Sequence, residues 1–335
     1  MEPLIRKIRQ IEKGDRKLTL CLILQGMLTG IFVAGLELVS SVLFLESHAA
    51  GRIPLAFMIS GGLGILISTI FSYFSRQLGV RIFGLLNLSA TGIMCLALLL
   101  LSGILPAGTF RFVLFVSSGP LVLITLMGFW STFRNFLPPA RVKQLSGLVE
   151  LGLAGGMVLA FLAIPLLVTG GLALLPALAL CTGCLVAAIP VHVQALRETR
   201  SGITYSGRKV QSTGPIGLIS HRYTAMMAAF ALVGVATVLV VQYAFLWVAD
   251  SQFPGGGDLV VFLGSFYGGM AVLTFLLKKI LFERLKKKFG TGTTLLLAPG
   301  ALMLVTVASA IAGESWSFTG DTFLFAWFFL LVAAG

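Results

Sequence analysis

Long uncharged apolar runs dominate this sequence and constrain its fold more than any other feature. The hydrocarbon core of a bilayer is about 30 Å thick, so a helix needs about 20 apolar residues to cross it. Nine runs reach this length, at residues 18–45, 53–75, 82–105, 112–133, 145–169, 171–195, 223–249, 259–277 and 291–313. With 57% hydrophobic and 11% charged residues, the chain is predicted to be an all-α polytopic membrane protein.

A tenth apolar run begins near Thr322 and reaches Gly335, the last residue of the sequence. It is too short to cross a bilayer, and a chain ending there would leave backbone carbonyl groups unpaired in hydrocarbon. We therefore expect residues 223–335 to be the start of a second helical bundle that continues in a longer protein.

The lysines and arginines are concentrated in every second gap between the spans, and therefore on one side of the membrane. Gaps on the side of the N-terminus carry 22 of them, and the opposite gaps carry only Arg52 and Arg111. This asymmetry predicts a cytoplasmic N-terminus. Because orientation already requires these basic residues, the net charge of +12 does not indicate nucleic-acid binding.

The hydrophilic segments divide the chain into bundles. Residues 1–17 have the pattern of an amphipathic helix on the inner leaflet, with Leu4, Ile8 and Ile11 on one face. The longest hydrophilic stretch, residues 197–222, is rich in Gly, Ser, Thr and basic side chains. We expect a first six-span bundle at residues 18–196, a cytoplasmic linker at 197–222 and a second bundle from 223 onward, an arrangement typical of the major facilitator superfamily.

An internal similarity supports two repeated halves. The second and third spans are joined by a basic cluster, Gly79 and an apolar run, and the eighth and ninth by a basic cluster, Gly290 and an apolar run. The two connections occupy equivalent positions in the topology. The sequence therefore favours a major-facilitator-like bundle of two six-helix repeats, of which the second is incomplete here.

Four stretches, at residues 43–68, 73–81, 141–161 and 260–300, resemble the bacterial relatives of the ATP/ADP translocases. The resemblance covers most of residues 17–313 and implies the facilitator fold and a place in the bacterial cytoplasmic (inner) membrane. It also implies a possible attached cytoplasmic domain, since HEAT-repeat or cyclic-nucleotide-binding domains often follow the membrane part in this family.

The substrate that the resemblance implies is a nucleotide. Exchange of ATP and ADP would require buried Lys or Arg to neutralise the phosphates, whereas every Lys and Arg here lies at the end of a span or between spans. The charged tract of the nucleotide carriers is replaced in the first span by residues 35–41, Gly-Leu-Glu-Leu-Val-Ser-Ser. We expect a small solute, such as an organic anion or a nucleotide-like compound.

Two carboxylates within spans are the main candidates for coupling or gating. Glu37 lies about 30 Å along the first helix from Lys17, beyond a strip of small residues formed by Gly26, Gly30 and Ala34. It could couple proton movement or contact substrate, or it could be an interface glutamate bonded to neighbouring helices. Glu150 lies about 10 Å into the fifth span and could close an inner gate or form a structural salt bridge.

Other polar residues are weaker candidates. Arg134 ends the fourth span, where it could contact an anionic substrate or simply fix orientation. Gln25, Gln242 and Tyr267 could line a cavity or form hydrogen bonds between helices. The glycine-rich stretches 60–64 and 152–156 lack the lysine of a phosphate loop and indicate close helix packing.

Enzymatic, metal or cofactor chemistry is not expected. The Cys181-x-x-Cys184 pair lies within an apolar run, where packing explains it better than metal binding. The three histidines, His48, His192 and His221, are expected near membrane surfaces and far apart. Two functions remain open: a secondary transporter of a small solute, or a transport-inactive membrane scaffold that anchors a cytoplasmic domain or protein partner.

Overall fold

The computed structural model describes residues 13–48, 50–78, 80–136, 139–198, 222–253 and 256–277. In this part of the chain, eight helices are long and apolar enough to cross a membrane. They correspond to the first eight predicted spans. The ninth and tenth predicted spans, most of the N-terminal segment and most of the linker lie outside the described residues.

The described elements follow one another as helices joined by short turns. In chain order they are α2 (Lys13–Ser47), η1 (Ala50–Arg52), α3 (Ile53–Gln77), α4 (Val80–Leu101), α5 (Ala107–Phe136), α6 (Pro139–Thr169), α7 (Leu174–Glu198), α9 (Arg222–Gln252) and α10 (Gly256–Leu277).

Several helices extend beyond the apolar runs that predict them. The first predicted span begins at residue 18, whereas α2 begins at Lys13 and is continuous through the basic residues Arg16 and Lys17, which are exposed. A helix can continue past the hydrocarbon boundary because its backbone hydrogen bonds are internal and its charged ends reach water. Between α6 and α7, Gly171 has a φ of 94°, a backbone conformation that glycine adopts without steric cost.

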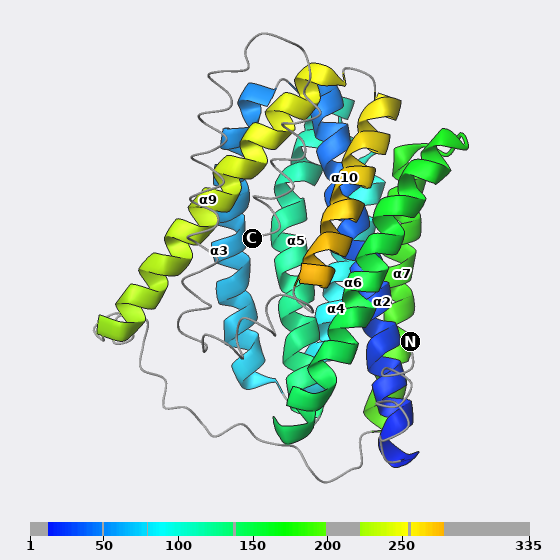
Figure 1. Ribbon diagram of the computed structural model, residues 1–335, viewed down its shortest axis with the longest axis vertical. Coiled ribbons are helices and arrows are strands. Elements are labelled where there is room, and N and C mark those ends of the chain that lie inside the picture. The colour runs from blue at the N-terminus through cyan, green and yellow to red at the C-terminus, as the bar shows by residue number, and fades with distance from the viewer. Residues whose placement is uncertain are drawn as a thin grey trace. The chain divides into compact units, whose positions relative to one another are not determined.

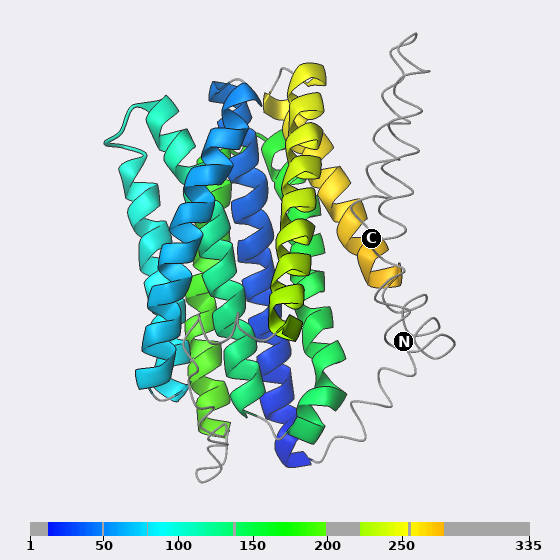
Figure 2. The ribbon, with the colours of Figure 1, turned by 90° about the vertical axis from the view of Figure 1, so that its left-hand side faces the viewer.

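The helices α2 to α7 form one bundle around α2 (Figure 1). Helix α2 packs against α5, α6 and α7, while α5 also packs against α3 and α4, and α4 against α7. In its apolar part α2 is 83% buried inside the protein, against 11% for α3. In Figure 2 the dark blue α2 is accordingly enclosed between the lighter blue and the green helices of the bundle.

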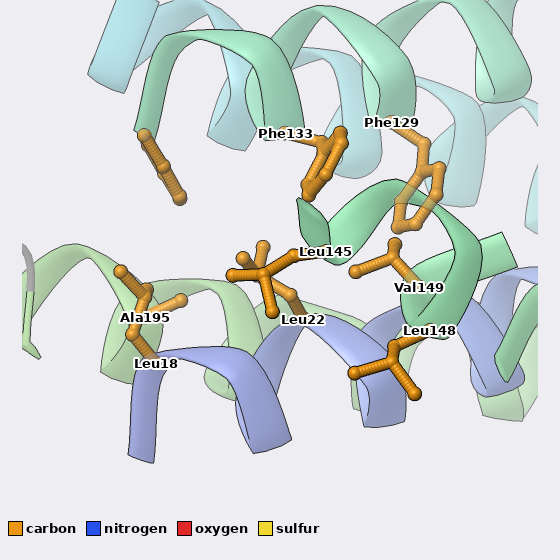
Figure 3. Close-up of a cluster of buried hydrophobic side chains, with 9 residues drawn as sticks. Leu18, Leu22, Phe129, Phe133, Leu145, Leu148, Val149 and Ala195 are labelled. Atoms are coloured by element: carbon orange, nitrogen blue, oxygen red, sulfur yellow. The ribbon is translucent and has the colours of Figure 1, made fainter. Parts of the chain in front are cut away.

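A cluster of apolar side chains packs α2 against its neighbours near the beginning of α2. It joins α2, α5, α6 and α7, whose side chains point toward one another in Figure 3. Its buried members are Leu18, Leu22, Phe129, Phe133, Phe136, Leu145, Leu148, Val149 and Ala195. Because the interior of a membrane bundle gains little from excluding water, tight van der Waals contact of this kind is what holds the helices together.

The described helices fall into two compact units. One contains α2 to α7 together with Phe253–Ser265, and therefore the first part of α10. The other contains α9 and the rest of α10 from Phe266. In the second unit Phe245 of α9 stacks on Phe266, with ring centroids 4.3 Å apart.

Candidate functional site

Glycines on both helices allow the backbones of α2 and α6 to approach each other closely. A Cβ atom on Gly30 would collide with the carbonyl oxygen of Leu153, and a Cβ atom on Gly156 would collide with that of Met27. A Cβ atom on Gly152 would stand 2.5 Å from the carbonyl oxygen of Ile23. The close helix packing predicted at Gly26, Gly30, Gly152 and Gly156 is therefore confirmed. The same prediction is wrong for the glycines of residues 60–64 and for Gly155, because a Cβ atom on any of them would meet nothing within 4 Å among the described residues.

Gln25 lies inside the bundle. Its side chain is buried, with 1% of its surface exposed, and its Oε1 lies 3.4 Å from Nδ1 of His192 in α7. Because an amide oxygen only accepts hydrogen bonds, Nδ1 carries the hydrogen in this pair. Of the two roles considered for Gln25, the structure shows the hydrogen bond between helices.

His192 is fully buried inside the bundle, at 0% exposure. Its ring stacks on Phe136 with centroids 5.6 Å apart. A Cβ atom on Gly84 of α4 would stand 2.9 Å from Nε2 of His192 and 2.7 Å from Oγ1 of Thr132. A side chain at position 84 would therefore collide with the imidazole, so glycine there leaves space for the ring. Among the described residues, Nε2 of His192 has no hydrogen-bond partner.

The interface between α4 and α5 continues this polar interior. Nδ2 of Asn87 donates a hydrogen bond of 3.3 Å to the carbonyl oxygen of Ile124, and a Cβ atom on Gly128 would collide with the same amide. Thr91 and Thr125 are buried and donate to carbonyl groups of their own helices. These groups stabilise the bundle from within, since each finds its partner in a helix of the first unit.

The two acidic candidates lie at different heights along two packed helices, α2 and α6. Glu37 follows Gly30 by seven residues, hence on the same side of α2, and is half-buried. Glu150, also half-buried, is next to Val149, whose carbonyl oxygen faces Gly26. The register of the two helices thus offsets the carboxylates by about 11 residues of helix, or about 16 Å, so they do not form one site.

The remaining candidates are dispersed. Arg134, in the last turn of α5, is exposed. Gln242, in α9, is half-buried. The ring of Tyr267, in α10, lies 5.8 Å from that of Phe245 and 6.1 Å from that of Phe266, measured between centroids. Gln242 and Tyr267 belong to the second unit, whereas the other four candidates belong to the first.

Charged and aromatic groups gather where α2 ends. Nη1 of Arg111 lies 3.4 Å from Oε2 of Glu46. His48 stacks on Phe44, and burial lowers the pKa of His48. The Arg52 guanidinium lowers this pKa further, as does that of Arg111, whereas the Phe44 carbonyl opposes the shift.

Acidification is expected to destabilise the protein partly through His48. In the unfolded chain its pKa is about 6.5, above that of the folded state, so the unfolded state binds the proton more readily. This contribution to stability is present above about pH 6.5 and is lost as the pH falls through the folded-state pKa. Between about pH 7.5 and about pH 5, the apparent melting temperature should fall more in the wild type than in His48→Gln. Equal falls would contradict this assignment.

Sequence reasoning missed the pairing of His192 with Gln25. A signal was present, because Gln25 lies nine residues after Arg16 and His192 lies six residues before Glu198, comparable depths in two helices that start and end on the same side. Without knowing that α2 packs on α7, nothing in the sequence joins them. Cys181, in contrast, packs as predicted: a Cβ atom on Gly35 would collide with its sulfur.

Within the described ranges, no group of three or more His, Cys, Asp or Glu side chains could hold a metal ion. The described residues form a packed helical bundle with two separated half-buried carboxylates. Asn87, Thr91 and Thr125 are hydrogen-bonded in its interior, whereas Nε2 of His192 has no partner among the described residues.

Comparison with known proteins shows the fold. No known protein family and no curated protein matches the sequence. A solved structure of a bacterial homologue of the human lysosomal transporter Spinster, in an inward-facing and unoccupied conformation, matches with a TM-score of 0.52 at 15% sequence identity. The match covers 97% of this chain and 73% of that chain. The chain is therefore a multi-pass membrane protein with a major-facilitator-like fold.

Proposed function

We propose that this protein is a secondary transporter that moves a small solute across the bilayer by alternating access, and that it is not an enzyme. The observation that carries the proposal is the likeness of its fold to a transporter structure over 97% of the chain. In this fold two helical halves rock about a site near the middle of the membrane. The glycine contacts between α2 and α6 support it, because they pack two helices of the first half directly against each other.

The charge distribution supports a definite orientation. With 22 of the 24 basic residues on one side, the N-terminus is cytoplasmic and the ends of α2 and α5 nearest Glu46 and Arg111 face outward. The membrane is a bacterial cytoplasmic membrane.

Glu37 is the best candidate for coupling and Glu150 for gating. Each is a half-buried carboxylate within a membrane-spanning helix, a placement that is costly unless it serves function or is paired. The substrate class is a small organic anion or a nucleotide-like compound. Relation to the ATP/ADP translocases is part of this proposal and rests on the sequence resemblance of residues 43–68, 141–161 and 260–300.

Uptake by proteoliposomes tests the proposal. Labelled nucleotides, organic anions and amino acids are offered to vesicles that contain the wild type, Glu37→Gln or Glu150→Gln. We expect saturable uptake of one class, reduced roughly tenfold or more by at least one variant, which corresponds to about 1.4 kcal/mol of lost stabilisation. Asp258→Asn is a matched control, because Asp258 is an exposed acid at the start of α10.

If no compound showed flux although the protein melted like a folded protein, this result would contradict the transporter and favour a membrane scaffold. One observation favours that second function. Gln25, a candidate for lining a cavity, bonds instead to His192 inside the bundle, which leaves fewer polar groups for a solute. A scaffold would bind a cytoplasmic domain or a protein partner, and its detergent-solubilised complex would be detected by size and mass.

A further inference from the structure

The first residue of α10 rests on the carboxylate of Glu46, close to the end of α2. A Cβ atom on Gly256 would collide with Oε1 of Glu46 in its present position, so glycine at this position allows the start of α10 to lie directly against the carboxylate. The other carboxylate oxygen, Oε2, lies 3.4 Å from Nη1 of Arg111 in α5. One carboxylate therefore joins three helices at this end of the first unit.

The electrostatics of this contact are favourable. The first backbone N–H groups of a helix have no partner within the helix, and the helix dipole places a partial positive charge there. A carboxylate between such an end and a guanidinium is attracted by both. The side chains of Arg111 and Glu46 are 29% and 25% exposed, so water weakens the attraction without abolishing it.

A single face of α10 carries this contact and a second one. Gly256, Val260 and Gly264 follow one another at intervals of four residues, hence on one side of the helix. A Cβ atom on Gly264 would collide with the ring of Pro165 in α6. Val260, midway between the two glycines, is 0% exposed. The two glycine contacts are about 12 Å apart along α10, and Val260 is buried between them.

We propose that Glu46 is a latch that holds the first part of α10 closed against the first bundle and releases it when the outer side opens. The inference rests on the proposed transport function and orientation. Arg111 is the feature that makes release possible, because it stays beside Glu46 when α10 leaves and no unpaired charge results. Glu46 is a positioning residue, since it acts on α10 and not on the solute.

Thiol labelling of Val260→Cys tests the latch in the whole chain. The four native cysteines (Cys21, Cys95, Cys181 and Cys184) are replaced by alanine, and the protein is placed in lipid nanodiscs so that a charged maleimide reaches both sides. We expect Val260→Cys to react slowly with Glu46 present and roughly tenfold faster with Glu46→Gln, the factor for losing one partly buried helix-end contact. The ion pair with Arg111 is not counted, because it persists when α10 is released. Glu46→Asp should restore part of the protection.

Two controls separate the latch from general loosening. Asp258→Asn removes another acid from the first turn of α10, where the side chain is exposed, and should leave the reactivity unchanged. Ser251→Cys, exposed in α9, should react rapidly in every background. Wild-type melting behaviour of Glu46→Gln shows that the first bundle remains folded.

A change of less than twofold in the reactivity of Val260→Cys on Glu46→Gln would overturn the proposal, as would an equal increase caused by Asp258→Asn. The readout requires no transported solute. A tenfold increase in the reactivity of Val260→Cys, without any flux in proteoliposomes, would therefore support the latch and contradict the transport function.

Discussion

Replacing Gly156 by valine is expected to lower the apparent melting temperature by roughly 6 to 12 °C, or to prevent folding. The added Cβ would meet the carbonyl oxygen, carbonyl carbon and Cα of Met27, all of them backbone atoms that no rotamer change can move. Helices α2 and α6 would have to separate along the face that carries the Gly30–Leu153 contact. Overpacking costs about 1 to 3 kcal/mol where side chains can adjust, and more against backbone, with about 2 to 4 °C per kcal/mol.

Gly155→Val is the matched control. Gly155 neighbours Gly156 on the same helix, but it is exposed and a Cβ atom there meets nothing within 4 Å. The two variants have the same helix propensity and composition, so a difference between them reports the contact with α2. A change of less than about 2 °C in both, measured by intrinsic fluorescence in the same detergent, would contradict the close packing of these two helices.

Gln25→Leu is expected to lower the apparent melting temperature by roughly 3 to 8 °C. The substitution removes the acceptor for Nδ1–H of His192 and leaves that donor buried, at a cost of about 1 to 3 kcal/mol. Substituting both residues by leucine removes donor and acceptor together. The double variant should therefore lose less stability than the two single effects combined, with an interaction of about 0.6 to 2 kcal/mol.

Gln194→Leu provides the reference for the exposed surface of α7, because Gln194 is two residues after His192 and faces outward. It should change the melting temperature by less than about 2 °C. Strict additivity of Gln25→Leu and His192→Leu would mean that the two side chains do not interact.

The number and order of the first eight spans could be predicted from the sequence alone. Their signal is an apolar run of about 20 residues, which depends only on the thickness of the bilayer and not on which helix packs against which. Small-residue spacing predicts the close contact at Gly30 and Gly156, since glycines one turn apart allow two backbones to approach. It fails at residues 60–64, where a Cβ atom on each glycine would meet nothing within 4 Å, because spacing alone does not say which glycines face another helix. The helix limits are less well predicted, because α2 continues to Lys13 through charged residues.

The candidate site depends on contacts between helices, and the hydropathy of the sequence does not predict which helices touch. His192 and Gln25 are 167 residues apart, and only the packing of α7 on α2 joins them. The contact between Glu46 and Gly256 likewise depends on where α10 begins in space. Of the candidates chosen as intramembrane polar groups, Gln25 has a defined partner inside the bundle, while the roles of Glu37, Glu150, Arg134, Gln242 and Tyr267 stay predictions.

The central claim, that this fold works as a carrier, is tested most directly by counterflow in proteoliposomes. Vesicles are loaded with an unlabelled solute at high concentration and diluted into a trace of the same solute in labelled form. A carrier with alternating access must show a transient accumulation of label inside, because internal unlabelled solute returns the binding site to the outside. We predict such an overshoot for one class of organic anion or nucleotide-like solute. No overshoot for any class, from protein whose melting behaviour shows that it is folded, would contradict the account.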